Sequence, residues 1–385
     1  MQRIQNKHKI AHKPKVLLGM SGGVDSSVSA ALLLQEGYEV VGGFIKNWSD
    51  TKDLWTGECE WRGERRDAMR VAAKLGIPLL TFDFEEAYRR TVVDELFRGY
   101  EAGETPNPDV LCNEFIKFGL FFDEAMRLGF DGIATGHYAR VENKQLAASS
   151  WQLGTESRCR LLRGSDPEKD QSYFLYRVPQ NVLRRTLFPI GHLQKSEVRQ
   201  IARDLHLPVS HKPDSQGICF IGKLDMTEFL RKKIPSRPGE IVDEDGHVLG
   251  QHTGLDGYTI GQRERICVSN GSEPWFVAEK DLASNRLIVV QGSEHPRLYR
   301  RDAIVHDLHW TRGVSPSLPL ECEVQIRYRQ ASIAATVEAT DADTCLHIQF
   351  HEPVKAITPG QSAVFYQGEE CLGGGIIHLI SAGPL

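Results

Sequence analysis

The stretch Val16-Leu-Leu-Gly-Met-Ser-Gly-Gly-Val-Asp-Ser-Ser27 decides the fold class of this chain. An aliphatic run leads into a Ser-Gly-Gly turn, and apolar residues at helical spacing follow over residues 26–35. Glycine lets a backbone approach an anion closely, and the N-terminus of a helix presents N–H groups at the positive end of its dipole. The stretch therefore predicts a strand, a phosphate-binding loop and a helix.

Around this loop, the first half of the chain alternates aliphatic runs with amphipathic stretches. The predicted strands cover residues 16–20, 40–45, 79–84 and 132–139, and the predicted helices cover residues 26–35, 65–75, 85–100 and 114–128. Several of these helices end near a glycine, at Gly37, Gly76 and Gly129. The alternation predicts an α/β domain with a doubly wound parallel sheet.

The second half of the chain has a different texture. From about residue 231, short alternating segments with frequent glycine replace the helical pattern, and the last strand candidates cover residues 321–328, 331–338, 345–350 and 362–367. We expect an α/β domain with the phosphate-binding loop over residues 1–225, a small central β-rich domain over 226–297, and a C-terminal β-barrel or sandwich over 298–385.

Composition excludes one class of nucleic-acid-binding protein. The chain has 385 residues, 41% of them hydrophobic, and its 46 basic and 51 acidic residues give a net charge of −5. These values are typical of a globular protein with two or three domains, and they exclude a histone-like polycation. They do not exclude a nucleic-acid enzyme, because phosphate contacts need only a locally basic surface.

The expected location is cytoplasmic. No run approaches the roughly 20 apolar residues of a membrane helix, and residues 1–15 are basic but lack the apolar segment of a secretory signal. We interpret residues 1–15 as a frayed basic arm, with organelle targeting as the alternative. The eight cysteines form no Cys-x-x-Cys pair, which favours a reducing compartment.

The phosphate loop differs from the two commonest nucleotide-binding loops. It has neither the Gly-Lys-Ser/Thr ending of nucleoside triphosphatases nor a Gly-x-Gly-x-x-Gly pattern. A plain turn, in which Asp25 or Ser26 caps the helix, is one alternative. The pattern resembles the signature of the ATP pyrophosphatases, which implies cleavage of ATP to AMP and pyrophosphate, with Mg²⁺ bridging the phosphates.

Two cysteines lie in polar loops. Cys112 follows Thr105-Pro-Asn-Pro-Asp-Val-Leu and is expected at or just before the first turn of a helix, where the dipole favours the thiolate. Glu114, in the same expected turn, would raise the pKa of that thiol. Cys219 lies in the loop that begins at His211, with Lys212 as a possible charge partner.

The alternative for both cysteines is a small buried side chain, which is the commonest fate of an unpaired cysteine. The flanking polar residues favour a functional role for these two. The other six cysteines are predicted to be structural: Cys59, Cys159, Cys267, Cys322, Cys345 and Cys371.

Five motifs in one order narrow the resemblance. After the phosphate loop come Asn107-Pro-Asp-x-x-Cys-Asn, Gly136-His-Tyr-Ala, Lys169-Asp-Gln-Ser-Tyr-Phe and Asp214-Ser-Gln-Gly-Ile-Cys. The set resembles the tRNA-specific 2-thiouridylases and spans most of the chain. The resemblance implies replacement of the C2 oxygen of the wobble uridine by sulfur, through an adenylated uridine.

The same resemblance assigns roles to individual residues. It implies that Cys219 carries a persulfide from a sulfur-donor protein and that Cys112 releases the sulfur, leaving a Cys112–Cys219 disulfide for a reductant. The implied ATP contacts are Gly19, Met20, Ser21, Gly22, Gly23, Val24, Asp25, Ser26, Ile45 and Gly136. The implied tRNA contacts are Asn107, Pro108 and Asp109 at the flipped target base, with Asp109 moving protons, and His137, Lys169, Asp170, Gln171, Arg327, Tyr328 and Gln361 elsewhere.

Several of these residues have a structural alternative. A lone histidine such as His137 is more often a core or surface residue, residues 169–171 could be a surface turn, and residues 326–330 could be an edge strand with outward arginines. Two other functions also fit the loop. One is an ATP pyrophosphatase acting on a small metabolite, and the other is a nucleotide-gated RNA-binding module in which the cysteines are incidental.

Overall fold

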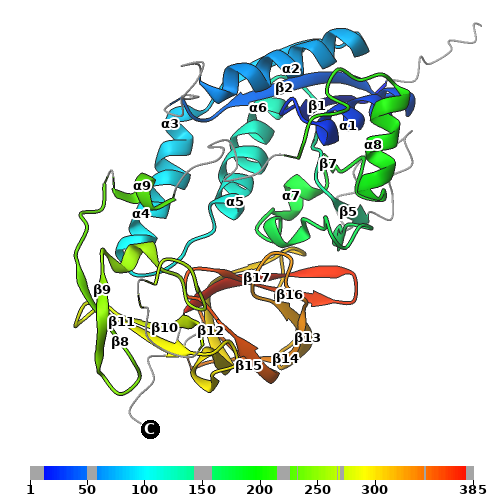
Figure 1. Cartoon of the computed structure of the whole chain (residues 1–385). Helices are drawn as coiled ribbons and strands as arrows, with labels where there is room; N and C mark the ends of the chain where they lie inside the picture. The colour runs from blue at the N-terminus through cyan, green and yellow to red at the C-terminus, as the bar shows by residue number, and fades with distance from the viewer. Residues whose placement is uncertain are drawn as a thin grey trace, which may run out of the picture.

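The computed structural model describes residues 13–49, 59–142, 158–214, 226–231, 233–266, 268, 273–341 and 344–378. Within these residues the chain forms a parallel sheet with helices, a four-stranded sheet and a β-barrel (Figure 1). Most of the predicted basic arm, residues 1–12, and the predicted site residue Cys219 lie outside the described residues. No helix in the described ranges is long and apolar enough to cross a membrane.

The parallel sheet confirms the predicted α/β fold. Its strands are β1 (Lys15–Gly19), β2 (Glu39–Lys46), β3 (Leu79–Asp83), β4 (Gly132–Ala134) and β7 (Thr186–Leu187), in the order β3-β2-β1-β4-β7. All four pairings are parallel. Val16, Leu17 and Leu18 of the central strand β1 are completely buried, as expected for a strand covered on both faces.

Helices cover both faces of this sheet. On one face, α1 (Val24–Gln35) and α2 (Glu60–Leu75) pack against β1 and β2, and α8 (Lys195–Asp204) packs on α1. On the other face lie two long helical segments with π-helical middles. They are α3 (Glu85–Tyr88), Arg89–Val93 and α4 (Asp94–Glu101), and then α5 (Pro108–Leu111), Cys112–Leu120 and α6 (Phe121–Arg127).

The predicted strand over residues 132–139 is wrong in its second half. Strand β4 ends at Ala134, and β5 (Ala139–Glu142) belongs to a different sheet. Between them the chain crosses the phosphate loop, where a Cβ on Gly136 would lie 2.8 Å from the backbone nitrogen of Ser26. An aliphatic pattern does not reveal this break, because Ala134 and Ala139, on its two sides, are both completely buried.

The C-terminal unit is a closed barrel rather than a sandwich. Its strands are β12 (Tyr299–Trp310), β13 (Leu320–Gln325), β14 (Ile333–Ala339), β15 (Leu346–Lys355), β16 (Ser362–Gln367) and β17 (Glu370–His378). They pair in the order β12-β15-β14-β13-β16-β17, and β17 pairs back with β12 to close the barrel. Closure leaves no free edge among these six strands.

Two further strands connect the α/β unit to this barrel. Strands β5 and β6 (Arg160–Arg163) form a hairpin that pairs with β17, with Leu162 opposite Glu370. The central sheet comprises β8 (Gly239–Val242), β9 (Val248–His252), β10 (Trp275–Asp281) and β11 (Arg286–Gln291), preceded by α9 (Met226–Arg231). The predicted domain boundaries near residues 225 and 297 stay predictions.

Candidate functional site

The phosphate loop connects β1 to α1 without a capping side chain. Gly23 is the N-cap of α1, and Gly22 has a φ of +73°, which is the left-handed region that favours glycine. The Ser27 hydroxyl donates to the Gly23 carbonyl at 2.6 Å, and the Ser21 N–H donates to the Ser26 hydroxyl at 3.3 Å. The alternative in which Asp25 or Ser26 caps the helix is therefore not observed, and the helix N-terminus suits an anion.

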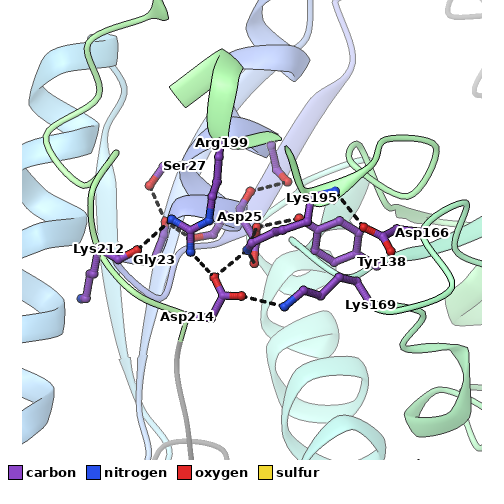
Figure 2. Close-up of polar contacts among 12 residues, drawn as sticks. Gly23, Asp25, Ser27, Tyr138, Asp166, Lys169, Lys195, Arg199, Lys212 and Asp214 are labelled. Atoms are coloured by element: carbon purple, nitrogen blue, oxygen red, sulfur yellow. Dashed lines mark hydrogen bonds and ion pairs between the residues drawn. The ribbon is translucent and has the colours of Figure 1, made fainter. Parts of the chain in front are cut away.

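A lysine far away in the sequence reaches this loop. The Lys195 ammonium donates to both carboxylate oxygens of Asp25, at 2.7 and 2.9 Å, and the Tyr138 hydroxyl donates to Asp25 at 2.9 Å (Figure 2). Lys195 is the first residue of α8, and its side chain is 12% exposed. The chain thus places a cation beside a loop whose own sequence lacks the usual phosphate-binding lysine.

Asp214 collects three further basic contacts next to the loop. Its carboxylate accepts hydrogen bonds from Lys169 at 2.8 Å and Arg199 at 2.6 Å, and it pairs with Lys195 at 2.8 Å (Figure 2). Burial tends to raise the pKa of Asp214, but the ammonium groups of Lys169 and Lys195 hold it well below its ordinary value. Asp214 is therefore ionised at neutral pH and orders this cluster of cations.

Lys212 ties the same region to the backbone of the loop. Its ammonium donates to the Gly22 carbonyl at 3.1 Å and to Asp67 at 2.9 Å. This is the lysine that we expected beside Cys219, and here it contacts the phosphate loop. Lys169, Lys195, Arg199 and Lys212 together give the loop a cationic rim, which suits a polyphosphate ligand.

Sequence reasoning assigned no role to Lys195, Arg199 or Asp214, although Asp214 begins one of the quoted motifs and one signal pointed to Lys195. A lysine at the first position of a helix opposes the helix dipole, so it is unfavourable unless another group compensates its charge. In α8, Glu197 supports the start of the helix through a capping box with Gln194, whereas Lys195 extends toward Asp25. A cation at a helix start can therefore indicate a functional contact.

The position predicted for Cys112 is wrong by one helical turn. The Asn107 side chain caps the helix by accepting from the N–H groups of Asp109 and Val110, at 3.1 and 3.4 Å, and Pro108 occupies the first helical position. Cys112 comes one turn later, is 0% exposed, and begins the π-helical segment. The Asn107-Pro108 pair, rather than the residues just before Cys112, thus marks the start of the helix. Cys112 lies in a π-helical segment, a feature that is frequent at functional sites.

Glu114 does not occupy the expected first turn either. Its carboxylate accepts from Arg177 at 2.6 Å, and Arg177 also pairs with Asp307 of β12 at 3.0 Å. Burial raises the pKa of Glu114, and Arg177 opposes that rise. The expected effect of Glu114 on the pKa of the Cys112 thiol stays a prediction.

The loop that precedes Cys112 rests on the barrel. The Thr105 N–H donates to the Pro359 carbonyl at 2.8 Å, and the Gln361 amide donates to the Thr105 carbonyl at 2.6 Å. A Cβ on Gly360 would lie 2.8 Å from the Thr105 nitrogen, so the two loops are in close contact. Gln361, a predicted tRNA contact, holds the loop that leads to Asn107.

Comparisons with known proteins agree along the whole chain. A family model described as the tRNA methyl transferase HUP domain matches residues 14–223, a PRC-barrel model matches 227–291, and an aminomethyltransferase beta-barrel model matches 300–377. The chain is 45% identical over 370 residues to the tRNA-specific 2-thiouridylase MnmA 2 of Geobacillus kaustophilus, and the aligned residues make up 96% of each chain. The chain belongs to the tRNA-specific 2-thiouridylase family.

Two other members of the family show the same extent of similarity. The MnmA of Alkaliphilus oremlandii is 47% identical over 369 residues, covering 95% of this chain and 97% of that protein. The MnmA of Proteus mirabilis is 48% identical over 368 residues, covering 94% and 96%. The resemblance expected from the motifs is therefore confirmed.

The family's Lys-Asp-Gln triplet makes internal contacts in this member. Lys169 pairs with Asp214, Asp170 accepts from the N–H groups of Gly164 and Ser172 at 2.9 and 3.0 Å, and the Gln171 side chain accepts from the Tyr138 N–H at 3.0 Å. These contacts connect the triplet to the phosphate-loop cluster. Their predicted role in binding tRNA stays a prediction.

Arg327 and Tyr328 lie where the three parts of the chain meet. The Arg327 guanidinium donates to Ile260 of the central unit, at 3.0 Å, and to the Thr358 hydroxyl of the barrel, at 2.7 Å. The Tyr328 ring lies 4.4 Å from the Phe174 ring, measured between centroids. The Phe174 backbone carbonyl accepts from the Asn113 side-chain amide at 3.3 Å. Phe174 therefore connects Tyr328 to the residue that follows Cys112.

His137 is a core residue in this structure. It is 8% exposed, and its Nδ1 lies 2.7 Å from the Thr135 hydroxyl. Burial, with the nearby charge of Lys117, lowers the pKa of His137 well below its ordinary value. The imidazole is therefore neutral at neutral pH, as the structural alternative for this residue predicts.

One group of side chains in the described part of the chain could hold a metal ion. It consists of Asp243, Asp245 and His247, in the turn between β8 and β9 of the central sheet. Asp243 also accepts from the N–H groups of Asp245 and His247, which is the ordinary bonding of a tight turn. The group lies in the central unit and contributes no residue to the phosphate loop.

Proposed function

We propose that this protein is an ATP-dependent sulfurtransferase that converts the wobble uridine of tRNA to 2-thiouridine. One observation carries the proposal: the long helical segment that contains Cys112 reaches the end of the strand that leads into the phosphate loop through Phe121, nine residues after Cys112. The Phe121 ring lies 3.8 Å from the position of a Cβ on Gly19. Full-length relatives named tRNA-specific 2-thiouridylase supply the substrate class.

The first step would activate the uridine. Its C2 oxygen attacks the α-phosphorus of ATP, pyrophosphate leaves, and the oxygen becomes part of a good leaving group, AMP. The N–H groups at the start of α1 and the ammonium of Lys195 would hold the phosphates, and Ile45 and Gly136 would contact the adenosine. Mg²⁺ would enter with the phosphates of ATP.

The second step would deliver sulfur. Cys219 would carry a persulfide received from a sulfur-donor protein, and its outer sulfur would replace AMP at C2. The Cys112 thiolate would attack the inner sulfur of Cys219, which breaks the S–S bond and forms a Cys112–Cys219 disulfide. A dithiol reductant would then restore both thiols.

The target uridine would leave the anticodon stack to reach this site. Asn107, Pro108 and Asp109 would contact the flipped base, because they form the helix start directly before Cys112. Asp109 would move protons during the exchange. Lys169, Asp170, Gln171, Arg327, Tyr328 and Gln361 would support the surrounding RNA surface, and we expect the reaction to take place in the cytoplasm.

A methyl transfer, which the family-model descriptions mention, accounts for fewer of the residues. Methyl transfer assigns no role to the ATP pyrophosphatase loop. It also assigns no role to the buried Cys112. Sulfur transfer uses both features. We therefore prefer sulfur transfer.

The test separates activation from sulfur transfer. Purified Cys112→Ser protein is incubated with unmodified tRNA, Mg-ATP and a persulfide donor, and pyrophosphate and 2-thiouridine are both measured. We expect tRNA-dependent pyrophosphate release without 2-thiouridine, since the uridine is activated but the sulfur is not released. The matched control, Cys345→Ser, changes a half-buried cysteine of the barrel and should retain both products.

Two results would contradict the proposal. Pyrophosphate release that does not need RNA would indicate an ATP pyrophosphatase that acts on a small metabolite. Tight tRNA binding by the wild-type protein without any pyrophosphate release would indicate a nucleotide-gated RNA-binding module.

A further inference from the structure

Asn47 is a buried amide without a hydrogen-bond partner. It directly follows β2, is 1% exposed, and neither its Oδ1 nor its Nδ2 has a partner in the described part of the chain. An amide removed from water without hydrogen bonds destabilises a fold, so each such group needs an explanation. A ligand that supplies one donor and one acceptor would explain this one.

The position of Asn47 corresponds to a ligand site in folds of this class. Ligands of parallel α/β sheets bind beyond the carboxyl ends of the strands, and β2 ends at Lys46 beside β1. Gly43 pairs with Gly19, where the phosphate loop begins. Asn47 lies four residues further along, which at about 3.3 Å per residue is about 13 Å beyond the start of the loop.

Two near neighbours of Asn47 in the sequence are apolar and buried. Ile45 and Trp48, on either side of it in the sequence, both belong to the buried cluster that contains Val110, Cys112 and Phe121. Lys46, directly before Asn47, pairs instead with Asp83 and Glu85, each at 2.9 Å. Ile45 is also the residue predicted to contact the adenosine, so Asn47 is two positions from the expected base.

We propose that Asn47 binds the adenine of ATP, with Oδ1 accepting from the N6 amino group and Nδ2 donating to the neighbouring ring nitrogen. An asparagine amide presents its acceptor and its donors side by side, which matches this edge of adenine. The inference rests on the proposed function, because it takes ATP as the nucleotide. It adds a base-recognition residue to a site so far defined by its phosphate contacts.

The experiment compares two nucleotides on two proteins. Asn47→Leu replaces the amide by an apolar side chain of similar size, and binding of ATP and of purine riboside triphosphate, which lacks the N6 amino group, is measured by calorimetry. We expect wild-type protein to bind ATP about 10-fold or more tightly than the analogue. Asn47→Leu should bind both nucleotides equally and weakly.

A stability measurement adds a second, independent result. Because Asn47→Leu removes an unpaired buried amide, the nucleotide-free variant should unfold at a temperature equal to or higher than that of the wild type. The matched control is Gln325→Leu, since Gln325 is a buried amide that donates to the Gln330 carbonyl at 3.1 Å. This control should lower the unfolding temperature and leave the ATP affinity unchanged.

The outcomes distinguish this inference from the proposed function. If wild-type protein binds ATP and forms 2-thiouridine, but Asn47→Leu binds ATP as tightly as wild type, the role of Asn47 is wrong and the function stands. The role of Asn47 is also wrong if wild-type protein binds ATP and the analogue equally tightly and Asn47→Leu weakens the binding of both by the same factor. If wild-type protein fails to bind ATP at all, the proposed function itself fails.

Discussion

A single ammonium group connects the phosphate loop to the rest of the candidate site. Lys195 lies 2.7 Å from Asp25 and 2.8 Å from Asp214, so its charge is shared between two carboxylates. A triphosphate carries more negative charge than either carboxylate. We therefore expect Lys195 to shift its hydrogen bonds toward the phosphates when ATP binds.

Replacing Lys195 should weaken ATP binding specifically. Hydrogen bonds between charged groups contribute about 1.5–3 kcal/mol, so Lys195→Met should raise the dissociation constant for ATP about 10- to 100-fold. Lys195→Arg keeps the charge and should lose much less affinity. Calorimetric titration with Mg-ATP measures both variants, and a Lys195→Met protein with wild-type affinity would remove Lys195 from the phosphate site.

At the scale of elements, the turn between β1 and α1 depends on a conformation available mainly to glycine. Gly22 has a φ of +73°, and a Cβ there would lie 2.3 Å from the Glu64 carbonyl oxygen of α2. Gly37, after α1, has a φ of +89° but no neighbouring atom within 4 Å of a Cβ. An alanine at Gly37 would therefore meet backbone strain alone, whereas an alanine at Gly22 would meet both backbone strain and a steric clash.

This difference predicts different costs for the two alanine substitutions. Gly37→Ala should lower the free energy of unfolding by about 1 kcal/mol through backbone strain alone. Gly22→Ala should lower it by about 2–3 kcal/mol and also weaken ATP binding, since either the loop or α2 must move. Urea unfolding and ATP titration test both, and equal behaviour of the two variants would contradict the steric account.

Local elements were predictable from the sequence, and the contacts between distant elements were not. The aliphatic run at residues 16–20, the Ser-Gly-Gly turn and Gly37 after the first helix predicted β1, the loop and α1, because these signals lie within a few residues. The start of the helix before Cys112 was misplaced because the Asn107-Pro108 signal was read as part of a loop. Lys195 was missed because its contact with Asp25 spans 170 residues.

At the scale of the whole molecule, a buried carboxylate joins the α/β unit to the barrel. Glu370 of β17 is 3% exposed, and it accepts from Arg160 of β6 at 2.8 Å and from Arg312 at 2.5 Å. Residue spacing could not predict this joint, because Glu370 and Arg160 are 210 positions apart. Elsewhere, the Gln361 amide of the barrel donates to the Thr105 carbonyl in the loop that leads to Asn107.

Glu370 should make the stability of the molecule depend on pH. Burial tends to raise its pKa, but the two arginines dominate and lower it below the usual value of 4.5. A lowered carboxyl pKa stabilises the fold above the unfolded-state value, and that stabilisation is lost as pH falls through the folded-state value. The effect should therefore be present at pH 7 and vanish in acid.

The variant Glu370→Gln tests this joint. Both arginines are partly exposed, so we expect a moderate loss of about 2 kcal/mol in the free energy of unfolding at pH 7, shrinking below about pH 4. Glu369→Gln is the matched control, because Glu369 is 71% exposed and pairs with Arg140 at the surface. Urea unfolding at both pH values measures the difference, and equal losses for the two variants would contradict the role of Glu370.

The most direct test of the central claim is nucleoside mass spectrometry of an unmodified tRNA with a uridine at the wobble position. The tRNA is incubated with the purified wild-type protein, Mg-ATP and a persulfide donor, and then digested. The account predicts 2-thiouridine at that position, and its absence when ATP is omitted. A folded protein that binds ATP and tRNA but adds no sulfur under these conditions would contradict it.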